Sequence, residues 1–158
     1  MPFTIVEAVS GSDVEAARAL FQAYAASLPF DLGFQNFADE LGGLPAPYAP
    51  PGGLLLLARD GNAATGTVGM KPLAAGIAEI KRLYVVPAAR GSGLGRALLD
   101  RALAATRARG YELVRLDSHR ASMGPAIALY ARFGFVEIAP YGPNPGGAFA
   151  FFEKQLRG

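Results

Sequence analysis

The fold is decided by the segment Val85-Val86-Pro87-Ala88-Ala89-Arg90-Gly91-Ser92-Gly93-Leu94-Gly95-Arg96. It consists of an apolar run that ends at a proline, a glycine-rich turn flanked by arginines, and a helix-forming sequence. The three glycines let the backbone turn tightly and bring its N–H groups close to a ligand. The helix that follows adds unpaired N–H groups and the positive end of its dipole. The segment therefore predicts a site for a phosphate or pyrophosphate group.

Two common phosphate-binding loops do not match this segment. The P-loop requires G-x-x-x-x-G-K-[ST], and no Lys-Ser or Lys-Thr pair follows these glycines. The dinucleotide fingerprint requires G-x-G-x-x-G, and its third glycine would fall on an arginine or a leucine here. The pattern that fits is R-x-x-G-x-G, at Arg90, Gly93 and Gly95. The glycines alone are equally consistent with an ordinary strand-to-helix turn.

The residues on either side of the turn favour a ligand site. Upstream the chain reads Lys81-Arg82-Leu83-Tyr84-Val85-Val86-Pro87, and downstream it reads Leu129-Tyr130-Ala131-Arg132-Phe133-Gly134-Phe135. In order and spacing, residues 77–137 resemble the GNAT superfamily of acyl-CoA-dependent N-acetyltransferases, with its fourth strand, its pyrophosphate loop and its "LYxxxGF" segment. The resemblance implies that acetyl-CoA is the cofactor, bound by Arg90, Gly91, Ser92, Gly93, Leu94, Gly95 and Arg96.

The rest of the chain alternates between strand-like and helix-like patterns. Strands are expected at residues 3–6, 54–59, 65–72, 77–86, 113–117, 135–138 and 149–156. Helices are expected at residues 34–41, 94–109 and 123–133, and from a capping box at Ser12 and Glu15 onward to Leu28. This order predicts a mixed α/β layer fold. The resemblance implies a mostly antiparallel central sheet in which the fourth and fifth strands splay apart to admit the pantetheine arm of the cofactor.

Composition excludes several classes of protein. Of the 158 residues, 51% are hydrophobic, which suits a single domain over residues 1–158. The longest apolar run, residues 54–58, is strand-sized, so no membrane partner is expected. The absence of cysteine excludes disulfides and thiolate catalysis. The net charge is only +2 and no dense basic run is present, so no nucleic-acid partner is expected. No signal-peptide pattern begins the chain, and the cytoplasm is the expected location.

The resemblance also implies roles at the cofactor thioester. The main chain of Leu83, Tyr84 and Val85 would pair with the pantetheine amides and direct an N–H group at the thioester carbonyl. The hydroxyl of Tyr130 would lie near the cofactor sulfur and act as general acid. The alternative for Tyr130 is a half-buried helix aromatic whose hydroxyl is satisfied elsewhere.

Glu79 is the candidate general base. It lies in an otherwise mostly apolar strand, where a carboxylate is costly unless it is paired or useful. Alternation would place Glu79, Lys81, Leu83 and Val85 on one face. An ion pair with Lys81 or Arg82 is the equally weighted alternative.

Two residues lie at or just before the start of the helix expected at residues 123–133, and one of them departs from the pattern of the GNAT family. Met123 stands where many relatives have an asparagine that bonds the cofactor arm, and Ser122 or Arg120 could substitute for it. His119, the only histidine, is expected to follow the fifth strand. A lone loop histidine is usually solvated, and without partner ligands it does not indicate a metal site.

The acceptor pocket is expected from the first two helices and the loop before the last strand. Candidate substrate contacts are Phe30, Phe34, Tyr48, Tyr141 and Asn144, for each of which core or loop packing is the alternative. The resulting hypothesis is direct acetyl transfer to the primary amine of a small molecule, by a monomer or homodimer. A non-catalytic acyl-CoA-binding module and a protein or peptide N-acetyltransferase are the alternatives.

Overall fold

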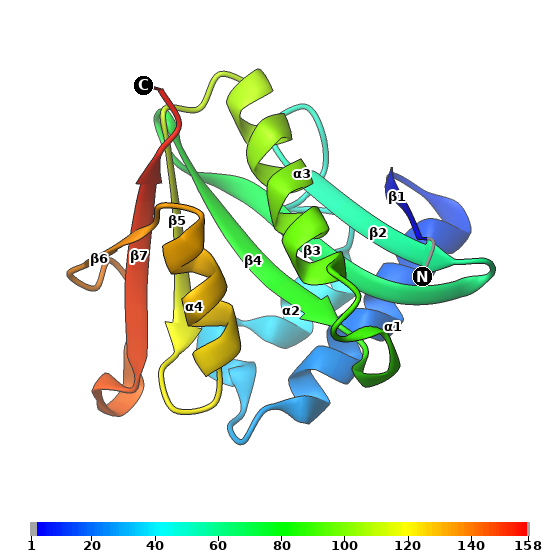
Figure 1. Ribbon diagram of the computed structural model, residues 1–158, viewed down its shortest axis with the longest axis horizontal. Helices are drawn as coiled ribbons and strands as arrows, with labels where there is room; N and C mark the ends of the chain where they lie inside the picture. Colours follow the sequence, from blue (N-terminus) through cyan, green and yellow to red (C-terminus); the bar gives the residue numbers. More distant parts are fainter. Residues whose placement is uncertain (1–2, 158) are drawn as a thin grey trace.

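The apolar runs of the sequence form a seven-stranded sheet in the computed structural model, which describes residues 3–157 (Figure 1). The strands are β1 (Thr4–Glu7), β2 (Leu54–Asp60), β3 (Ala63–Ala74), β4 (Ile77–Val85), β5 (Leu113–His119), β6 (Val136–Ile138) and β7 (Phe149–Gln155). The α-helices are α1 (Gly11–Ser27), α2 (Phe37–Gly43), α3 (Leu94–Ala108) and α4 (Gly124–Arg132). Short 3₁₀ turns are η1 (Leu32–Gln35), η2 (Pro87–Ala89) and η3 (Pro145–Gly147).

The strand order across the sheet is β1-β2-β3-β4-β5-β7-β6. Every neighbouring pair is antiparallel except β4 and β5, which run parallel. Their pairing covers only three positions and ends at Glu79 opposite Arg115. Beyond this point β5 pairs with β7 alone as far as His119, while β4 continues to Val85. The predicted mixed fold and the splay of the fourth and fifth strands are therefore confirmed.

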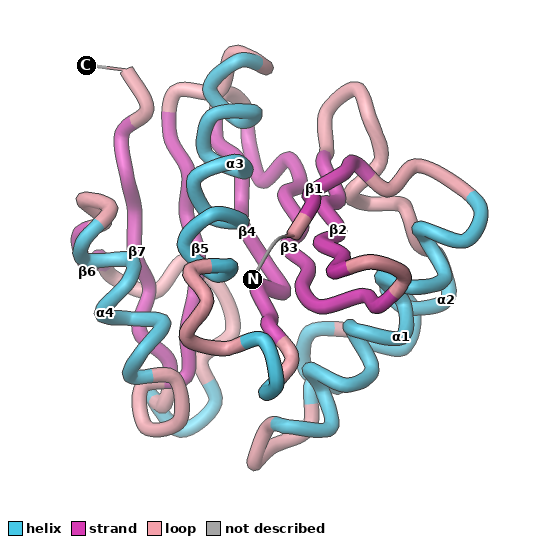
Figure 2. The backbone as a smooth tube through the Cα atoms, turned by 45° about the vertical axis from the view of Figure 1, so that its right-hand side comes forward, coloured by secondary structure: helices cyan, strands magenta, loops and turns pink. Residues whose placement is uncertain are grey.

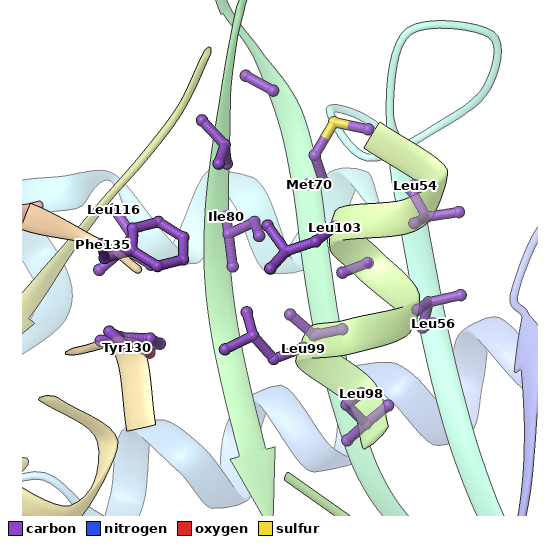
Figure 3. Packing of buried hydrophobic residues seen from close by; sticks show 14 of the residues in the cluster. Leu54, Leu56, Met70, Ile80, Leu98, Leu99, Leu103, Leu116, Tyr130 and Phe135 are labelled. Atoms are coloured by element: carbon purple, nitrogen blue, oxygen red, sulfur yellow. The ribbon is translucent and has the colours of Figure 1, made fainter. Parts of the chain in front are cut away.

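Helices cover both faces of the sheet, with α3 and α4 on one face and α1 and α2 on the other (Figures 1 and 2). The larger core lies under α3, where Leu98, Leu99 and Leu103 pack against strand residues such as Met70 and Ile80 (Figure 3). A second core cluster lies between the sheet and α1. Both clusters form because β2 is apolar at successive positions and so presents buried side chains to both faces.

A β-bulge at Arg82 interrupts β4. Lys81 pairs with Gly69 and Tyr84 pairs with Thr67, so two residues of β4 stand opposite one residue of β3. Arg82 has a φ of 63°, a left-handed conformation that is uncommon for a residue with a side chain.

The bulge corrects the face assignment made from strict alternation. A single extra residue moves all following side chains to the opposite face. Leu83 and Val85 therefore pack against the core under α3, on the opposite face from Glu79. Arg82 takes the face that Leu83 was expected to share, and its guanidinium contacts Glu40 of α2.

Several element boundaries also differ from the sequence prediction. Helix α1 begins one residue before Ser12, its N-cap residue is Ser10, and no side chain caps it. The predicted capping box is therefore wrong, and Glu15 instead binds Arg18 on the exposed face. Strand β5 extends through His119, which places this residue on the sheet rather than in a loop.

We expect Leu98→Ala to lower the free energy of unfolding by about 2–5 kcal/mol, because a fully buried leucine leaves a cavity when truncated. Urea denaturation followed by circular dichroism measures this change. Val136→Ala is the control, since Val136 is 61% exposed and its truncation should have a small effect. Equal effects of the two substitutions would contradict the packing described for α3.

Candidate active site

A cavity opens where β4 separates from β5. Its lining residues come from both strands, from α1 and from the beginning of α4: Tyr24, Ile80, Lys81, Arg82, Leu83, Asp117, Met123, Ala126 and Tyr130. A second pocket shares Tyr24, Met123 and Ala126 with the first and extends to Arg90 and Ser122. The two pockets share three lining residues and therefore adjoin, and the second extends to Arg90 beside the glycine-rich turn.

The glycine-rich turn has the geometry of an anion site. Gly91 and Gly93 have φ values of 83° and 85°, which favour glycine, and an added Cβ at either would meet no atom within 4 Å. The first backbone bond of α3 runs from Ala97 N to Gly93 O. The N–H groups at the start of α3 consequently have no helical partner and are available to a ligand. The Arg90 side chain is exposed beside them, and its Nε donates to the Val85 carbonyl at 3.0 Å.

The backbone of β4 past Glu79 has no strand partner on its β5 side. Leu83, Tyr84 and Val85 lie on this unpaired stretch, where an extended ligand can pair with main-chain groups. The Tyr84 side chain itself is buried against Tyr24, with the ring centroids 5.9 Å apart. Leu94 contributes only backbone here, because its side chain is in the core.

Tyr130 lines the cavity from α4. Its ring packs against Phe135 and Phe152, with centroid distances of 5.8 and 6.3 Å. Its hydroxyl has no hydrogen-bond partner in residues 3–157. Every fully buried side-chain oxygen of that range does have a partner, so the Tyr130 oxygen is not fully buried. It therefore opens onto the cavity that the residue lines. Burial raises the pKa of Tyr130, which keeps the phenol protonated at neutral pH.

Glu79 is buried but does not belong to the residues that line the cavity. The Tyr141 hydroxyl donates to the Glu79 carboxylate at 2.7 Å. Lys71, which lies opposite Glu79 on β3, places its Nζ 3.8 Å from Glu79 Oε1. Burial and the Glu79 charge raise the pKa of Tyr141. The ion-pair partner of Glu79 is thus Lys71 rather than Lys81 or Arg82. Arg82 binds Glu40 of α2 instead.

Arg82 forms the most buried ion pair in residues 3–157. Its guanidinium donates to both carboxylate oxygens of Glu40, at 2.9 and 2.7 Å, and to the side chain of Gln35 at 2.9 Å. The Arg82 and Glu40 side chains are only 2% and 9% exposed. Although burial opposes its ionisation, the hydrogen bond and charge of Arg82 hold the pKa of Glu40 below its ordinary value. The pair ties α2 and η1 to the β4 bulge.

Two charged residues of the cavity were not singled out as catalytic by the sequence. Asp117 of β5 and Lys81 of β4 both line it. Burial raises the pKa of Asp117 and lowers the pKa of Lys81. The signal that identified Glu79, a carboxylate within a mostly apolar strand, is equally present in Leu113-Val114-Arg115-Leu116-Asp117.

Two of the predicted acceptor contacts meet in an aromatic cluster. Phe30 and Phe34 pack against Phe149 of β7, with centroid distances of 5.3 and 5.4 Å. His119 lies 4.6 Å from the Phe30 ring and 5.3 Å from the Phe149 ring. His119, which was predicted to be a solvated loop residue, is therefore part of this aromatic cluster.

The other three predicted contacts have defined structural partners. Tyr48 is completely buried under Gly69 and donates to Glu40 at 2.8 Å, so it is a core residue and not an open contact. Asn144 exchanges two hydrogen bonds with the backbone of Phe149 and fixes the loop before β7. Tyr141 reaches the site through its bond to Glu79.

Met123 is the N-cap residue of α4 and lines both pockets. Its sulfur accepts from the Ser118 hydroxyl at 3.1 Å and from the His119 N–H at 3.3 Å. Ser122 reaches the second pocket, whereas Arg120 is turned to Glu137 on the surface. Ser122 is thus the better placed of the two substitutes for the usual asparagine.

Two kinds of feature are absent from residues 3–157. None of the helices in this range combines the length and apolar character needed to cross a bilayer. Nor does any group of three or more histidine, aspartate or glutamate side chains there come together as metal ligands would.

Comparison with known proteins gives consistent results. Residues 51–137 match the family model of the acetyltransferase (GNAT) domain. An uncharacterised N-acetyltransferase of Schizosaccharomyces pombe is 38% identical over 135 residues, which cover 84% of this chain and 82% of that protein.

Solved structures share the fold. A GNAT-family acetyltransferase of Staphylococcus aureus superposes with a TM-score of 0.80 at 20% identity, covering 99% of this chain and 100% of that one. The yncA protein of Salmonella typhimurium, solved with its cofactor acetyl-CoA, superposes with a TM-score of 0.66 at 21% identity, covering 98% and 94%.

We expect Glu40→Gln to lower the free energy of unfolding by about 3–5 kcal/mol at pH 7, because it leaves the buried Arg82 charge without its partner. Since the Glu40 pKa is lower in the folded state, the stabilisation is complete above the ordinary carboxyl pKa and lost as the pH falls through the folded value. The difference between wild type and variant should therefore shrink below about pH 4.3.

Urea denaturation between pH 3 and pH 7 measures this dependence. Glu15→Gln is the matched control, since Glu15 pairs with Arg18 on the exposed surface and its loss should matter little. A Glu40→Gln effect that stays constant with pH would contradict the role of the ion pair.

Proposed function

Because the chain belongs to the GNAT family of acetyltransferases, we propose that it transfers an acetyl group from acetyl-CoA directly to the primary amine of a small molecule. The observation that carries this proposal is the pair of adjoining pockets. One is lined by Tyr130 and by the charged side chains of β4 and β5, and the other extends to Arg90 beside the glycine-rich turn. Donor and acceptor can thus be held together in one space, which supplies much of the acceleration in such a transfer.

The residues present fit acetyl-CoA, the acetyl donor of this family. The pyrophosphate suits the free N–H groups from Gly91 to Arg96, with the Arg90 and Arg96 side chains exposed beside them. The pantetheine amides suit the unpaired backbone of Leu83, Tyr84 and Val85. An N–H group of this stretch would polarise the thioester carbonyl.

Tyr130 is proposed as the general acid. Its hydroxyl faces the cavity without a partner in residues 3–157, and burial keeps it protonated. Proton donation to the departing thiolate needs such a group within hydrogen-bond reach. The chain has no cysteine, which excludes a cysteine thioester acyl-enzyme, and no recognisable serine triad. Direct attack of the amine on the donor is therefore proposed.

Glu79 is proposed as the general base. Its carboxylate does not line the cavity, but it lies on the same face of β4 as Lys81, which does, and it is held by Tyr141 and Lys71. From there it would receive the proton of the acceptor amine through an intervening water.

The aromatic cluster favours a small acceptor over a peptide. Phe30 and Phe34 belong to the segment after α1, and both contact Phe149 of β7. The cluster therefore bridges the space between α1 and β7, where the acceptor is proposed to bind. A peptide substrate would require an open groove at this place.

Release of free CoA thiol from acetyl-CoA tests the proposal across amino acids, polyamines, aminoglycosides and N-terminal peptides. We expect turnover with at least one small amine and none with peptides. Calorimetric titration of acetyl-CoA is run alongside. Tight binding without turnover on any acceptor would instead favour an acyl-CoA-binding module, and activity on peptides alone would favour a protein acetyltransferase.

We expect Gly93→Ala to raise the Kd for acetyl-CoA by about tenfold or more, because a side chain disfavours the left-handed conformation that presents the loop N–H groups. Gly110→Ala is the matched control. Gly110 has a φ of 90° and equally open surroundings, but it lies at the other end of α3. Calorimetry should give an unchanged Kd for the control, and an equal loss in both variants would argue against the pyrophosphate site.

We expect Tyr130→Phe to lower kcat by about 10²–10⁴-fold, the range for a general acid, while acetyl-CoA affinity is kept. Tyr111→Phe is its control, because Tyr111 bonds to the Gly52 carbonyl at 2.7 Å and does not line the cavity. Steady-state kinetics on the best acceptor measure both. A Tyr130→Phe variant with wild-type kcat would exclude the phenol as the acid.

A further inference from the structure

Lys81 and Asp117 face one another across the gap between β4 and β5. The last paired positions of the two strands are Glu79 and Arg115, and each residue lies two positions further along its strand. Both therefore project on the face of Glu79, and both line the same cavity.

Neither residue has a polar partner in the part of the chain that the structure describes. No hydrogen bond of either side chain and no ion pair within 4.0 Å is present in residues 3–157. Every fully buried side-chain nitrogen or oxygen in that range does have a hydrogen-bond partner, so these two charged groups are not fully buried. The Lys81 ammonium and the Asp117 carboxylate must therefore be accessible from the cavity.

The neighbouring charges are already engaged. Arg82 is bound by Glu40, and Glu79 by Lys71 and Tyr141. Arg115, which precedes Asp117 on the same face, binds Glu153 of β7 at 2.8 Å. Lys81 and Asp117 are consequently the charges of this region that remain for a ligand.

We infer that Lys81 and Asp117 recognise the acceptor as an α-amino acid, with Lys81 binding its carboxylate and Asp117 its ammonium group. The inference rests on the proposed function and specifies its substrate class. It assigns binding to these two residues and leaves proton transfer to Glu79 and Tyr130.

The energetic reason is the cost of unpaired charge in a partly desolvated cavity. A zwitterion supplies one opposite charge to each side chain, whereas a simple amine leaves Lys81 unpaired. Burial lowers the pKa of Lys81 and raises the pKa of Asp117, and the opposite charge of each residue offsets only part of the shift of the other.

The acceptor side chain has a defined direction. His119 lies two residues beyond Asp117 on the same face of β5, and it is part of the aromatic cluster with Phe30, Phe34 and Phe149. An amino acid held at Asp117 would place its side chain toward this cluster. Amino acids with an apolar or aromatic side chain therefore fit best.

Matched acceptors test the inference, because phenylalanine and phenethylamine differ only in the carboxylate. We expect wild type to prefer phenylalanine in kcat/KM by about 10- to 100-fold, the value of a hydrogen bond between charged groups. Lys81→Met should lose this preference by losing activity on phenylalanine alone. Asp117→Asn should lose activity on both amines, mainly through KM. Lys154→Met, on the far end of β7, is the control and should keep the preference.

Acetyl-CoA affinity, measured by calorimetry, verifies that each variant is folded, and Lys81→Arg provides a charge-preserving variant that should retain the preference. Equal activity of wild type on the two amines would overturn the inference while the proposed function stands. An equal loss on both amines in Lys81→Met would do the same. Binding of acetyl-CoA without turnover of any amine would overturn the proposed function together with the inference.

Discussion

The separation of β4 from β5 is the constraint on which the site depends. The two strands pair at only three positions, although β4 pairs with β3 and β5 with β7 along most of their length. Main-chain groups that would normally close the sheet are left open to a ligand, and the side chains on both strands line the resulting cavity. Tyr130 of α4 lines the pocket between the separated strands, and Arg90 of the turn before α3 lines the adjoining pocket.

The bulge at Arg82 determines what the cavity contains. Without it, strict alternation would direct Arg82 into the core under α3, where a guanidinium would lack partners. With it, Arg82 reaches Glu40 and Gln35, and the left-handed backbone at this residue is held by a buried, bidentate ion pair. These contacts fasten α2 and η1 to β4, the strand along which acetyl-CoA is proposed to bind.

Donor and acceptor sides of the site are built from different kinds of groups. The donor side uses main-chain N–H groups, glycine conformations and the end of a helix, so most of its side chains can vary freely. The proposed acceptor side uses Lys81, Asp117, Glu79 and an aromatic cluster drawn from segments far apart in the chain. The proposal thus assigns selectivity for an acceptor to side chains and recognition of acetyl-CoA mainly to the backbone.

The sequence by itself determined the family, the order of helices and strands, the splayed sheet and the glycine-rich turn. The order of the elements follows from local periodicity and the turn from its glycines, whereas the family and the splayed sheet were implied by the resemblance of residues 77–137 to that family. Only the tertiary structure decided that Tyr48 is buried in the core, that Glu79 binds Lys71 and Tyr141, and that Lys81 faces Asp117. The physical reason is that strand register and the packing of distant segments join residues that no local pattern relates, and that the bulge at Arg82 reverses the facing of Leu83 and Val85 after it.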